Sequence, residues 1–247
     1  MRGGADGMID FHSHILPGID DGAENVNESL KMLRMSKAQG VDGLVATPHF
    51  YPEKEKPDSF LARRKKSLTA LAGAYTRDLP DLYLGAEVAY FTGIGRCETL
   101  KSLCIVGTRV ILIEMPFCEW SESVIHDLYG VSEKLGLLPV VAHIERYIGF
   151  QSHDIIYRLT NHGIRIQANA SYFCDRKTRR KALKMLGSGD IHIIGSDCHN
   201  LTSRPPNLGS CMEEIKTKID TEMAEYVTET SEILLSSAVS LHSVLKK

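Results

Sequence analysis

The chain alternates short apolar runs with amphipathic stretches, and this regular alternation limits the folds open to it. Seven runs of strand length, rich in leucine or β-branched residues, span residues 8–12, 43–47, 82–87, 110–114, 138–142, 164–168 and 191–194. Five stretches with helical patterning lie between them, at residues 25–38, 58–77, 121–135, 152–161 and 175–186. Strands that alternate with helices predict an α/β protein in which helices wrap a parallel sheet.

A closed or nearly closed barrel is the architecture that we expect, with an open doubly wound sheet as the alternative. The 247 residues, 43% of them hydrophobic, fit one globular domain with a sizeable core, and single α/β barrels fall in this size range. We therefore expect one domain over residues 8–247, closed by helices within 210–247. Residues 1–7 are Gly-rich and resemble a disordered leader or a cloning remnant.

Six of the seven predicted strands end in or beside a residue type that binds metals. His12 and His14 form an HxH motif at the end of the first strand, and residues two apart on a strand point the same way. The other candidates at or just after strand ends are Asp21, His49, Glu87, Glu114, His143, Asp197 and His199. Because chemistry in a parallel barrel collects at the carboxyl ends of the strands, this pattern predicts a metal site there.

The residue types narrow the metals that such a site would hold. Imidazole and carboxylate groups without a thiolate suit zinc, manganese or iron. One mononuclear site takes only three or four protein ligands, so nine candidates imply two or three ions with bridging carboxylates. Asp21 has an alternative role, because acidic residues before a glycine, here Asp20-Asp21-Gly22, are common in turns.

Composition excludes several other classes of function. The formal net charge of −2 and pI near 6.6 give no general attraction to nucleic acid or to anionic membranes, so we expect neither as a partner. No apolar run approaches the roughly 20 residues needed to cross a bilayer. The six cysteines form no CxxC pair and no signal peptide precedes them, which favours a reduced, cytoplasmic protein. Cys198 lies between two candidate ligands, but in an extended segment its side chain points away from Asp197 and His199, so we do not expect it to be a nucleophile.

Two known families share parts of this pattern. The binuclear amidohydrolases also begin with an HxH strand, but their carboxylated lysine at the end of the fourth strand has no equivalent in Leu112-Ile113-Glu114-Met115. The segments 12–23, 46–49 (Ala-Thr-Pro-His), 142–147 (Ala-His-Ile-Glu-Arg-Tyr) and 196–200 (Ser-Asp-Cys-His-Asn) together resemble the polymerase and histidinol phosphatase (PHP) superfamily. Within it they are similar to the bacterial capsular polysaccharide tyrosine phosphatases, in order, from Met8 to about Gly209.

This resemblance implies a distorted (β/α)7 barrel with a trinuclear metal site at the carboxyl ends of the strands. By matching motifs, one ion would be held by His12, His14, Glu87 and Asp197. The second would be held by Glu87, Glu114 and His143, and the third by Asp21, His49 and His199. Three divalent ions are thus implied per chain, manganese foremost, with iron or zinc as alternatives.

Two arginines after the candidate ligands suggest an anionic substrate. Arg146 follows His143 and Arg204 follows His199, and a guanidinium can engage two phosphoryl oxygens at once. Ordinary structural salt bridges are the alternative for both. In the resembled branch the matching arginines face substrate phosphate. Aromatic residues near the predicted rim, which could form walls for a tyrosine ring, are Phe50, Tyr51, Phe117, Trp120 and Tyr172.

The resemblance therefore implies a metal-dependent protein tyrosine phosphatase that acts on a phosphotyrosine protein, namely the tail of a bacterial tyrosine kinase that regulates capsular or exopolysaccharide synthesis. A phenolate leaving group, with a pKa near 10, suits a site without an obvious general acid. Two alternatives remain open. One is a histidinol-phosphate phosphatase or another phosphoesterase of the superfamily, and the other is a non-catalytic binding module that metals stabilise.

Overall fold

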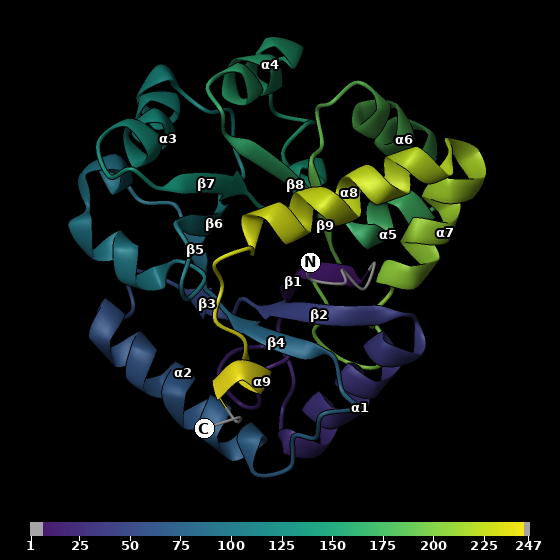
Figure 1. Cartoon of the computed structure of the whole chain (residues 1–247). Coiled ribbons are helices and arrows are strands. Elements are labelled where there is room, and N and C mark those ends of the chain that lie inside the picture. Colours follow the sequence, from purple (N-terminus) through teal and green to yellow (C-terminus); the bar gives the residue numbers. More distant parts are fainter. Residues whose placement is uncertain (1–6, 245–247) are drawn as a thin grey trace.

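Parallel strands arranged around a common centre form the middle of the molecule, with helices outside them (Figure 1). The structure is a computed structural model that describes residues 7–244. Its strands are β1 (Met8–Ser13), β2 (Val41–Ala46), β3 (His49–Phe50), β4 (Asp81–Leu84), β5 (Glu87–Ala89), β6 (Val110–Glu114), β7 (Leu138–Val141), β8 (Arg165–Asn169) and β9 (Ile193–Gly195). They form two sheets in the orders β1-β2-β4 and β3-β5-β6-β7-β8-β9, with every pair parallel.

The two sheets are continuous along the chain. Only Thr47 and Pro48 separate β2 from β3, and only Gly85 and Ala86 separate β4 from β5. The nine strands therefore occupy seven positions, at the places where the sequence predicts strands. The prediction of one strand over residues 82–87 is wrong in detail, because β4 and β5 are separate strands. The two strands pair with different partners, β4 with β2 and β5 with β3 and β6.

Backbone contacts between β1 and the segment after β9 close the ring. Ser13 forms an isolated parallel bridge with Cys198, the N–H of Asp197 donates to the carbonyl of His12 at 2.8 Å, and the N–H of His14 donates to the carbonyl of Cys198 at 2.9 Å. Together with the break between the two sheets, this gives the distorted seven-position α/β barrel that the sequence predicts. That prediction is confirmed.

Side chains fill the barrel and cover it at the amino end of the strands. Phe11, Leu112, Val140 and Ile193 belong to an inner apolar cluster that also includes Leu235. Leu235 directly follows α8 (Thr221–Leu234), a helix that lies across β9 and β1 (Figure 1). A larger cluster packs the outer faces of the strands against the surrounding helices. Because the interior is filled, the carboxyl ends of the strands are the place left for chemistry.

The outer helices largely follow the predicted ranges. The main ones are α1 (Val26–Ala38), α2 (Pro57–Ala72), α3 (Glu122–Glu133), α4 (His153–Asn161) and α6 (Arg179–Gly187). Asn25 caps α1 by accepting the N–H of Glu28, whereas α2 stops at Gly73, earlier than predicted. The stretch predicted as one helix over 175–186 begins only at Arg179, because a separate short helix, α5 (Ala170–Cys174), precedes it.

The remaining elements close the chain and link the strands. The predicted closing helices are present as α7 (Leu208–Lys218), α8 and α9 (Leu241–Val244). Short 3-10 helices, which the sequence analysis missed, are η1 (Ile94–Arg96), η2 (Glu98–Leu103) and η3 (Ile144–Arg146). Apart from Gly7, the leader predicted at residues 1–7 lies outside the described residues.

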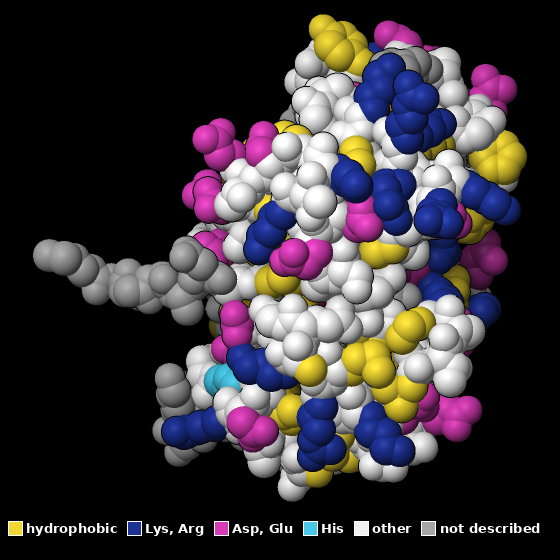
Figure 2. All heavy atoms as spheres, turned by 90° about the vertical axis from the view of Figure 1, so that its right-hand side faces the viewer, with side chains coloured by type: hydrophobic (Ala, Val, Ile, Leu, Met, Phe, Trp, Pro, Cys, Tyr) yellow, Lys and Arg dark blue, Asp and Glu magenta, His cyan; other side chains and the backbone are white. Residues whose placement is uncertain are grey.

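The outer surface mixes charges of both signs. Figure 2 faces the side where α6 and α7 lie and shows basic, acidic and apolar side chains interspersed, with Lys and Arg gathered toward one end. Exposed basic residues of α6 include Arg180, Lys181 and Lys184. None of the helices between residues 7 and 244 has both the length and the apolar character needed to cross a membrane.

Candidate metal centre

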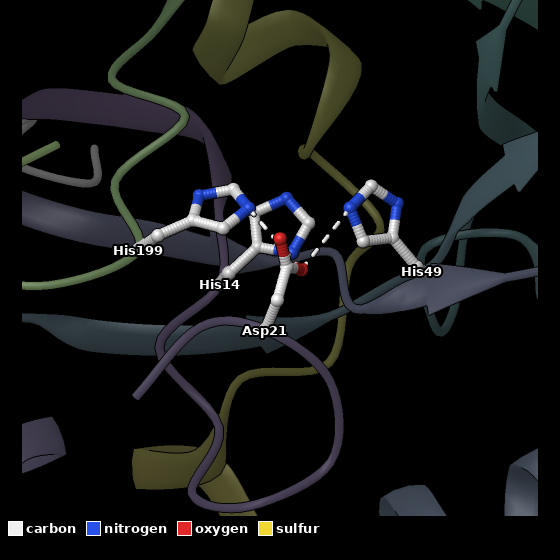
Figure 3. Close-up of side chains that lie close together, drawn as sticks. All are labelled: His14, Asp21, His49 and His199. Carbon is white, nitrogen blue, oxygen red and sulfur yellow. Dashed lines mark ion pairs between the residues drawn. The ribbon is translucent and has the colours of Figure 1, made fainter. Parts of the chain in front are cut away.

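All nine predicted ligands lie together at the carboxyl ends of the strands. His12 is in β1 and His14 just follows it, His49 begins β3, Glu87 begins β5, and Glu114 ends β6. Asp21 comes from the loop before α1, and His143, Asp197 and His199 come from the segments after β7 and β9. Figure 3 shows His14, Asp21, His49 and His199 converging from these separate segments. The barrel thus brings together residues that lie up to 187 positions apart in the chain, the separation of His12 and His199.

The potential ligand atoms form three overlapping groups, each with its atoms within 4.8 Å of one another. The groups are His14, Asp21, His49 and His199; His12, His14 and Glu87; and His49, Glu87 and Glu114. His143 joins the last group through Nε2, which lies 2.8 Å from Oε1 of Glu87 and 3.6 Å from Oε1 of Glu114. The partition implied by resemblance differs from this one, since His14 and His49 each belong to two groups.

Unpaired buried atoms show that this donor set fits divalent cations. Oε2 of Glu87 has no hydrogen-bond partner, although ring nitrogens of His49, His12 and His14 lie 3.0, 3.2 and 3.4 Å away. Nε2 of His12 also faces Nε2 of His14 at 3.2 Å. Buried polar atoms without partners are costly, and cations among these nitrogens and oxygens would satisfy them together.

Hydrogen bonds behind the cluster set the direction of two imidazoles. Nδ1 of His14 lies 2.8 Å from Oδ2 of Asp20, and Nδ1 of His199 lies 2.9 Å from the carbonyl oxygen of Asp197. An ionised carboxylate and a carbonyl can only accept, so each ring donates from Nδ1. In the neutral ring Nε2 then carries the lone pair, and this pattern of outer partners is typical of metal-binding histidines.

Charge interactions keep the central carboxylates ionised. Burial alone would raise the pKa of Glu87, but the charge of His12, together with the nearby ring nitrogens of His14 and His143, holds it well below its usual range. The pKa of Asp197 is likewise held low against burial by His12 and His14. Burial and the neighbouring Glu87 raise the pKa of Glu114.

The two predicted anion-binding arginines lie beside the cluster and share one partner. An Nη2 atom of Arg146 and one of Arg204 each donate to Oδ2 of Asp197 at 2.6 Å. Their side chains are 33% and 38% exposed. Each of these bonds uses one of the five N–H donors of a guanidinium, so the salt bridges do not exclude an anion at the same arginines.

The structure places only two of the five aromatic residues predicted to contact a tyrosine ring beside the cluster. Phe50, Trp120 and Tyr172 are buried in the apolar core. Tyr51 stacks on His49 with ring centroids 5.2 Å apart, and Phe117, 54% exposed, stacks on His143 at 6.5 Å. Tyr51 also lines a cavity of about 580 Å³ together with Asp21, His49 and Lys54. Only Tyr51 and Phe117 among the five are thus placed to meet a substrate.

Four polar residues near the centre were missed or undervalued at the sequence level. Asp20, which entered there only as part of the Asp20-Asp21-Gly22 turn, has a side chain that is only 6% exposed and supports His14. Gln167 and Asn169 are buried in β8, and Glu145 accepts the N–H of Asn169 at 3.3 Å. The sequence did offer one indication of Gln167 and Asn169, because two amides at alternate positions of an apolar strand must find hydrogen-bond partners when they are buried.

Cys198, which lies between two candidate ligands in the sequence, has no role in the cluster. Its side chain is fully buried, and burial raises the pKa of the thiol, so it stays protonated. A nucleophilic cysteine would need a lowered pKa and access to substrate. The structure therefore agrees with the rejection of a cysteine mechanism.

A parallel barrel whose strand ends carry clustered histidines and carboxylates is the architecture of metal-dependent hydrolases. Solved structures with this fold include the phosphotriesterase homology protein from Escherichia coli, with a TM-score of 0.56 at 11% identity over 94% of this chain and 99% of that one. The similarity is greater to a structure from a study of YwqE from Bacillus subtilis and CpsB from Streptococcus pneumoniae, described as metal-dependent tyrosine phosphatases. There the TM-score is 0.78 at 25% identity, over 94% of this chain and 96% of the other.

Sequence comparison places the chain more narrowly. Residues 8–235 match the family model for capsular polysaccharide synthesis, CpsB/CapC, and the protein belongs to this family. A putative tyrosine-protein phosphatase CapC from Staphylococcus aureus is 29% identical over 93% of this chain and 92% of its own length. The tyrosine-protein phosphatase CpsB from Streptococcus agalactiae is 31% identical over 84% and 89%. The resemblance noted from the motifs is confirmed.

Proposed function

We propose that the protein is a metal-dependent protein tyrosine phosphatase. The observation that supports this most directly is the convergence of nine metal-binding side chains and two arginines on one barrel rim, with Asp197 common to both sets. Relatives named tyrosine-protein phosphatases match over most of their length. A structural zinc site is closed by about four ligands, and it has no use for arginines beside it.

The nine residues would hold three divalent ions, which we propose to be manganese, with iron or zinc as substitutes. Such ions lower the pKa of bound water and withdraw charge from a phosphoryl group. Glu87 is central, because its two oxygens face His143 on one side and His12, His14 and His49 on the other. The lone pairs that Nε2 of His14 and of His199 direct into the cluster suit this role.

Arg146 and Arg204 are the residues that we propose to bind the substrate phosphate. Asp197 anchors both guanidinium groups in advance, so little side-chain freedom is lost when an anion arrives. Their remaining N–H groups would stabilise the charge that develops on the phosphoryl oxygens during transfer. A phenolate leaves with little need for protonation, which favours phosphotyrosine over phosphoserine at a centre of this kind.

Tyr51 and Phe117 would contact the ring of the phosphotyrosine. Each is stacked on a different candidate ligand, His49 and His143, and both of these ligands contact Glu87. Stacking holds the two aromatic side chains beside candidate metal ligands, where they would meet the phenyl group of the substrate. We further propose that the substrate is the tail of a bacterial tyrosine kinase, that residues 8–247 work as one domain, and that the protein acts in the cytoplasm.

The proposal is tested by combining metal analysis with a panel of substrates. The manganese-loaded protein should hydrolyse phosphotyrosine peptides, and His143→Ala and Arg146→Ala should each lower kcat/KM by about a hundredfold or more. His126→Ala is the matched control, because His126 is exposed on α3. Hydrolysis of histidinol phosphate without phosphotyrosine activity would favour the other superfamily reaction. Bound metal without turnover of any phosphoester would favour a binding module.

A further inference from the structure

Strand β8 is the exception to the pattern of ligands at strand ends. Its end contributes two carboxamide side chains, Gln167 and Asn169, and no member of the proposed ligand set. Gln167 is fully buried and Asn169 is 5% exposed. Because they are two positions apart on a strand, both point to the same side of the sheet. Buried amides need hydrogen-bond partners, and the partners found here all belong to the candidate centre.

The orientation of each amide follows from the one before it. The backbone N–H of His143 can only donate, so the atom that it meets at 2.7 Å must be Oε1 of Gln167. Nε2 of Gln167 then donates to Oδ1 of Asn169 at 3.0 Å, which turns Nδ2 of Asn169 toward Oδ2 of Asp197 at 2.8 Å. A single backbone donor thus fixes the direction of the whole series.

The same series selects one form of the His12 ring. Oε1 of Gln167 lies 3.3 Å from Nδ1 of His12, and since this oxygen only accepts, Nδ1 must carry a proton. In the neutral ring Nε2 is then unprotonated, and it is this atom that faces Glu87 at 3.2 Å and Asp197 at 3.6 Å. Gln167 therefore fixes the proton of His12 on Nδ1, as Asp20 fixes the proton of His14 on Nδ1.

Both ends of the series meet backbone that is strained. His143 and Asp197 are the two non-glycine residues with positive φ in the described part of the chain, at 29° and 53°. Such conformations cost free energy and persist only where the surroundings hold them. The backbone of His143 donates to Gln167, and the side chain of Asp197 accepts from Asn169.

We propose that Gln167 and Asn169 are positioning residues that hold His12, His143 and Asp197 in the geometry for binding metals. Through Oδ2 of Asp197, which also accepts from Arg146 and Arg204, the β8 amides link the metal ligands to the arginines. The proposal rests on the ligand set given under Proposed function. It goes beyond that set because the side chains of both amides bond to candidate ligands and to each other.

The first test replaces Gln167 with methionine, which keeps the length of the side chain and removes the three hydrogen bonds of the amide, with His143, His12 and Asn169. Gln167→Met should bind manganese or zinc about 10- to 100-fold more weakly in competition with a chelator. In the zinc-loaded protein, the Nδ1–H proton of His12 should be protected from exchange and visible by NMR in the wild type but not in the variant. Gln39→Met is the matched control, because the amide of Gln39 likewise joins separate segments, through hydrogen bonds with Pro206 and Gly209, but lies outside the centre.

The second test asks whether the two amides act in series. Asn169→Leu should raise KM for a phosphotyrosine peptide as well as weaken metal binding, because Asp197 also orients the arginines. The double variant should lose less affinity than the product of the two single losses, since either change breaks the same chain of bonds. Conservative Asn169→Gln, whose longer amide cannot keep both bonds, should not restore affinity.

The outcomes separate this proposal from the proposed function. Wild-type metal affinity and an unchanged His12 signal in Gln167→Met would overturn the positioning role. A wild-type chain that binds no divalent metal would overturn both ideas. Metal binding that depends on Gln167, in a protein that hydrolyses no phosphotyrosine, would support the positioning role and reject only the phosphatase.

Discussion

Nδ1 of His14 lies 2.8 Å from Oδ2 of Asp20, and this buried carboxylate also accepts the backbone N–H groups of Gly22 and His49, each at 3.0 Å. Burial alone would raise its pKa, but the hydrogen bond and charge of His14 lower the pKa of Asp20 to about 2. One side chain in the loop after β1 therefore holds two candidate ligands from different strands, His14 and His49. The neighbouring Asp21 does something else, since it is 66% exposed and faces His49 and His199.

Asparagine at these two positions should have different effects. Asp20→Asn would turn an NH2 group toward donors that now share the carboxylate and would leave those donors without an acceptor, so we expect a loss of about 1–3 kcal/mol in the free energy of unfolding. Metal affinity should fall at least tenfold as well. Asp21→Asn should leave the stability within about 0.5 kcal/mol and change only the number or affinity of bound metals. Urea unfolding of the metal-free proteins, with metal analysis, measures both, and equal stabilities for the two variants would contradict the assignment.

The difference between Asp20 and Asp21 also shows how far the sequence could lead. The candidate ligands at strand ends could be predicted from the sequence. Alternate residues of a strand point the same way, and the carboxyl ends of parallel barrel strands meet at one rim. Which of two adjacent acids turns inward depends on the path of an irregular loop, which no periodicity describes. The break between β4 and β5 could not be predicted either, because residues 82–87 form one apolar run. The sequence of a strand does not specify its neighbours, and here β4 pairs with β2 while β5 pairs with β6.

Gly195 lies so close to β1 that any side chain there would displace a candidate ligand. A Cβ atom on Gly195 would lie 2.5 Å from Cβ of His12 and 2.7 Å from its backbone nitrogen. Gly195→Ala should therefore cost several kcal/mol of stability and reduce the bound metal. Gly187→Ala is the control, because a Cβ at the end of α6 meets nothing within 4 Å and alanine favours helix. Thermal unfolding and metal content of both variants provide the measurement, and equal melting temperatures would show that β1 and β9 can separate freely.

Lysine in place of either arginine should separate charge from geometry. Arg146→Lys and Arg204→Lys keep a positive charge near Asp197 but lose the planar fork that grips two phosphoryl oxygens. We expect kcat/KM for a phosphotyrosine peptide to fall by about 10- to 100-fold in each, with the metal content unchanged. Arg158→Lys serves as control, because Arg158 pairs with Glu122 on the outer helices. Full activity in both variants would show that neither arginine binds the substrate phosphate through its planar guanidinium group.

The two accessible aromatics should matter only for substrates that carry a ring. Tyr51→Leu and Phe117→Leu should each raise KM for aryl phosphates by roughly 2- to 10-fold, the value of one aromatic contact, and leave alkyl phosphates unaffected. Tyr51→Phe should retain the wild-type KM. Tyr157→Leu, on a side chain that is 61% exposed, provides the control. Equal effects on aryl and alkyl phosphates would point to a disturbed metal centre instead, through His49 or His143.

His192 gives a prediction for pH that does not depend on the metal ligands. It is 7% exposed and Nδ1 accepts the N–H of Ile166 at 3.2 Å, while burial and then the charge of Arg165 lower the pKa to about 4. In the unfolded chain the pKa returns to about 6.5, so between these values the unfolded state binds more protons. Stability should therefore fall as the pH drops from about 6.5 to 4, by up to about 3 kcal/mol from this residue. His192→Asn, which keeps an acceptor for Ile166, should unfold in urea with a smaller change between pH 7 and 5, with chelator present in both proteins. Identical pH slopes would mean that folding leaves the pKa of His192 unchanged.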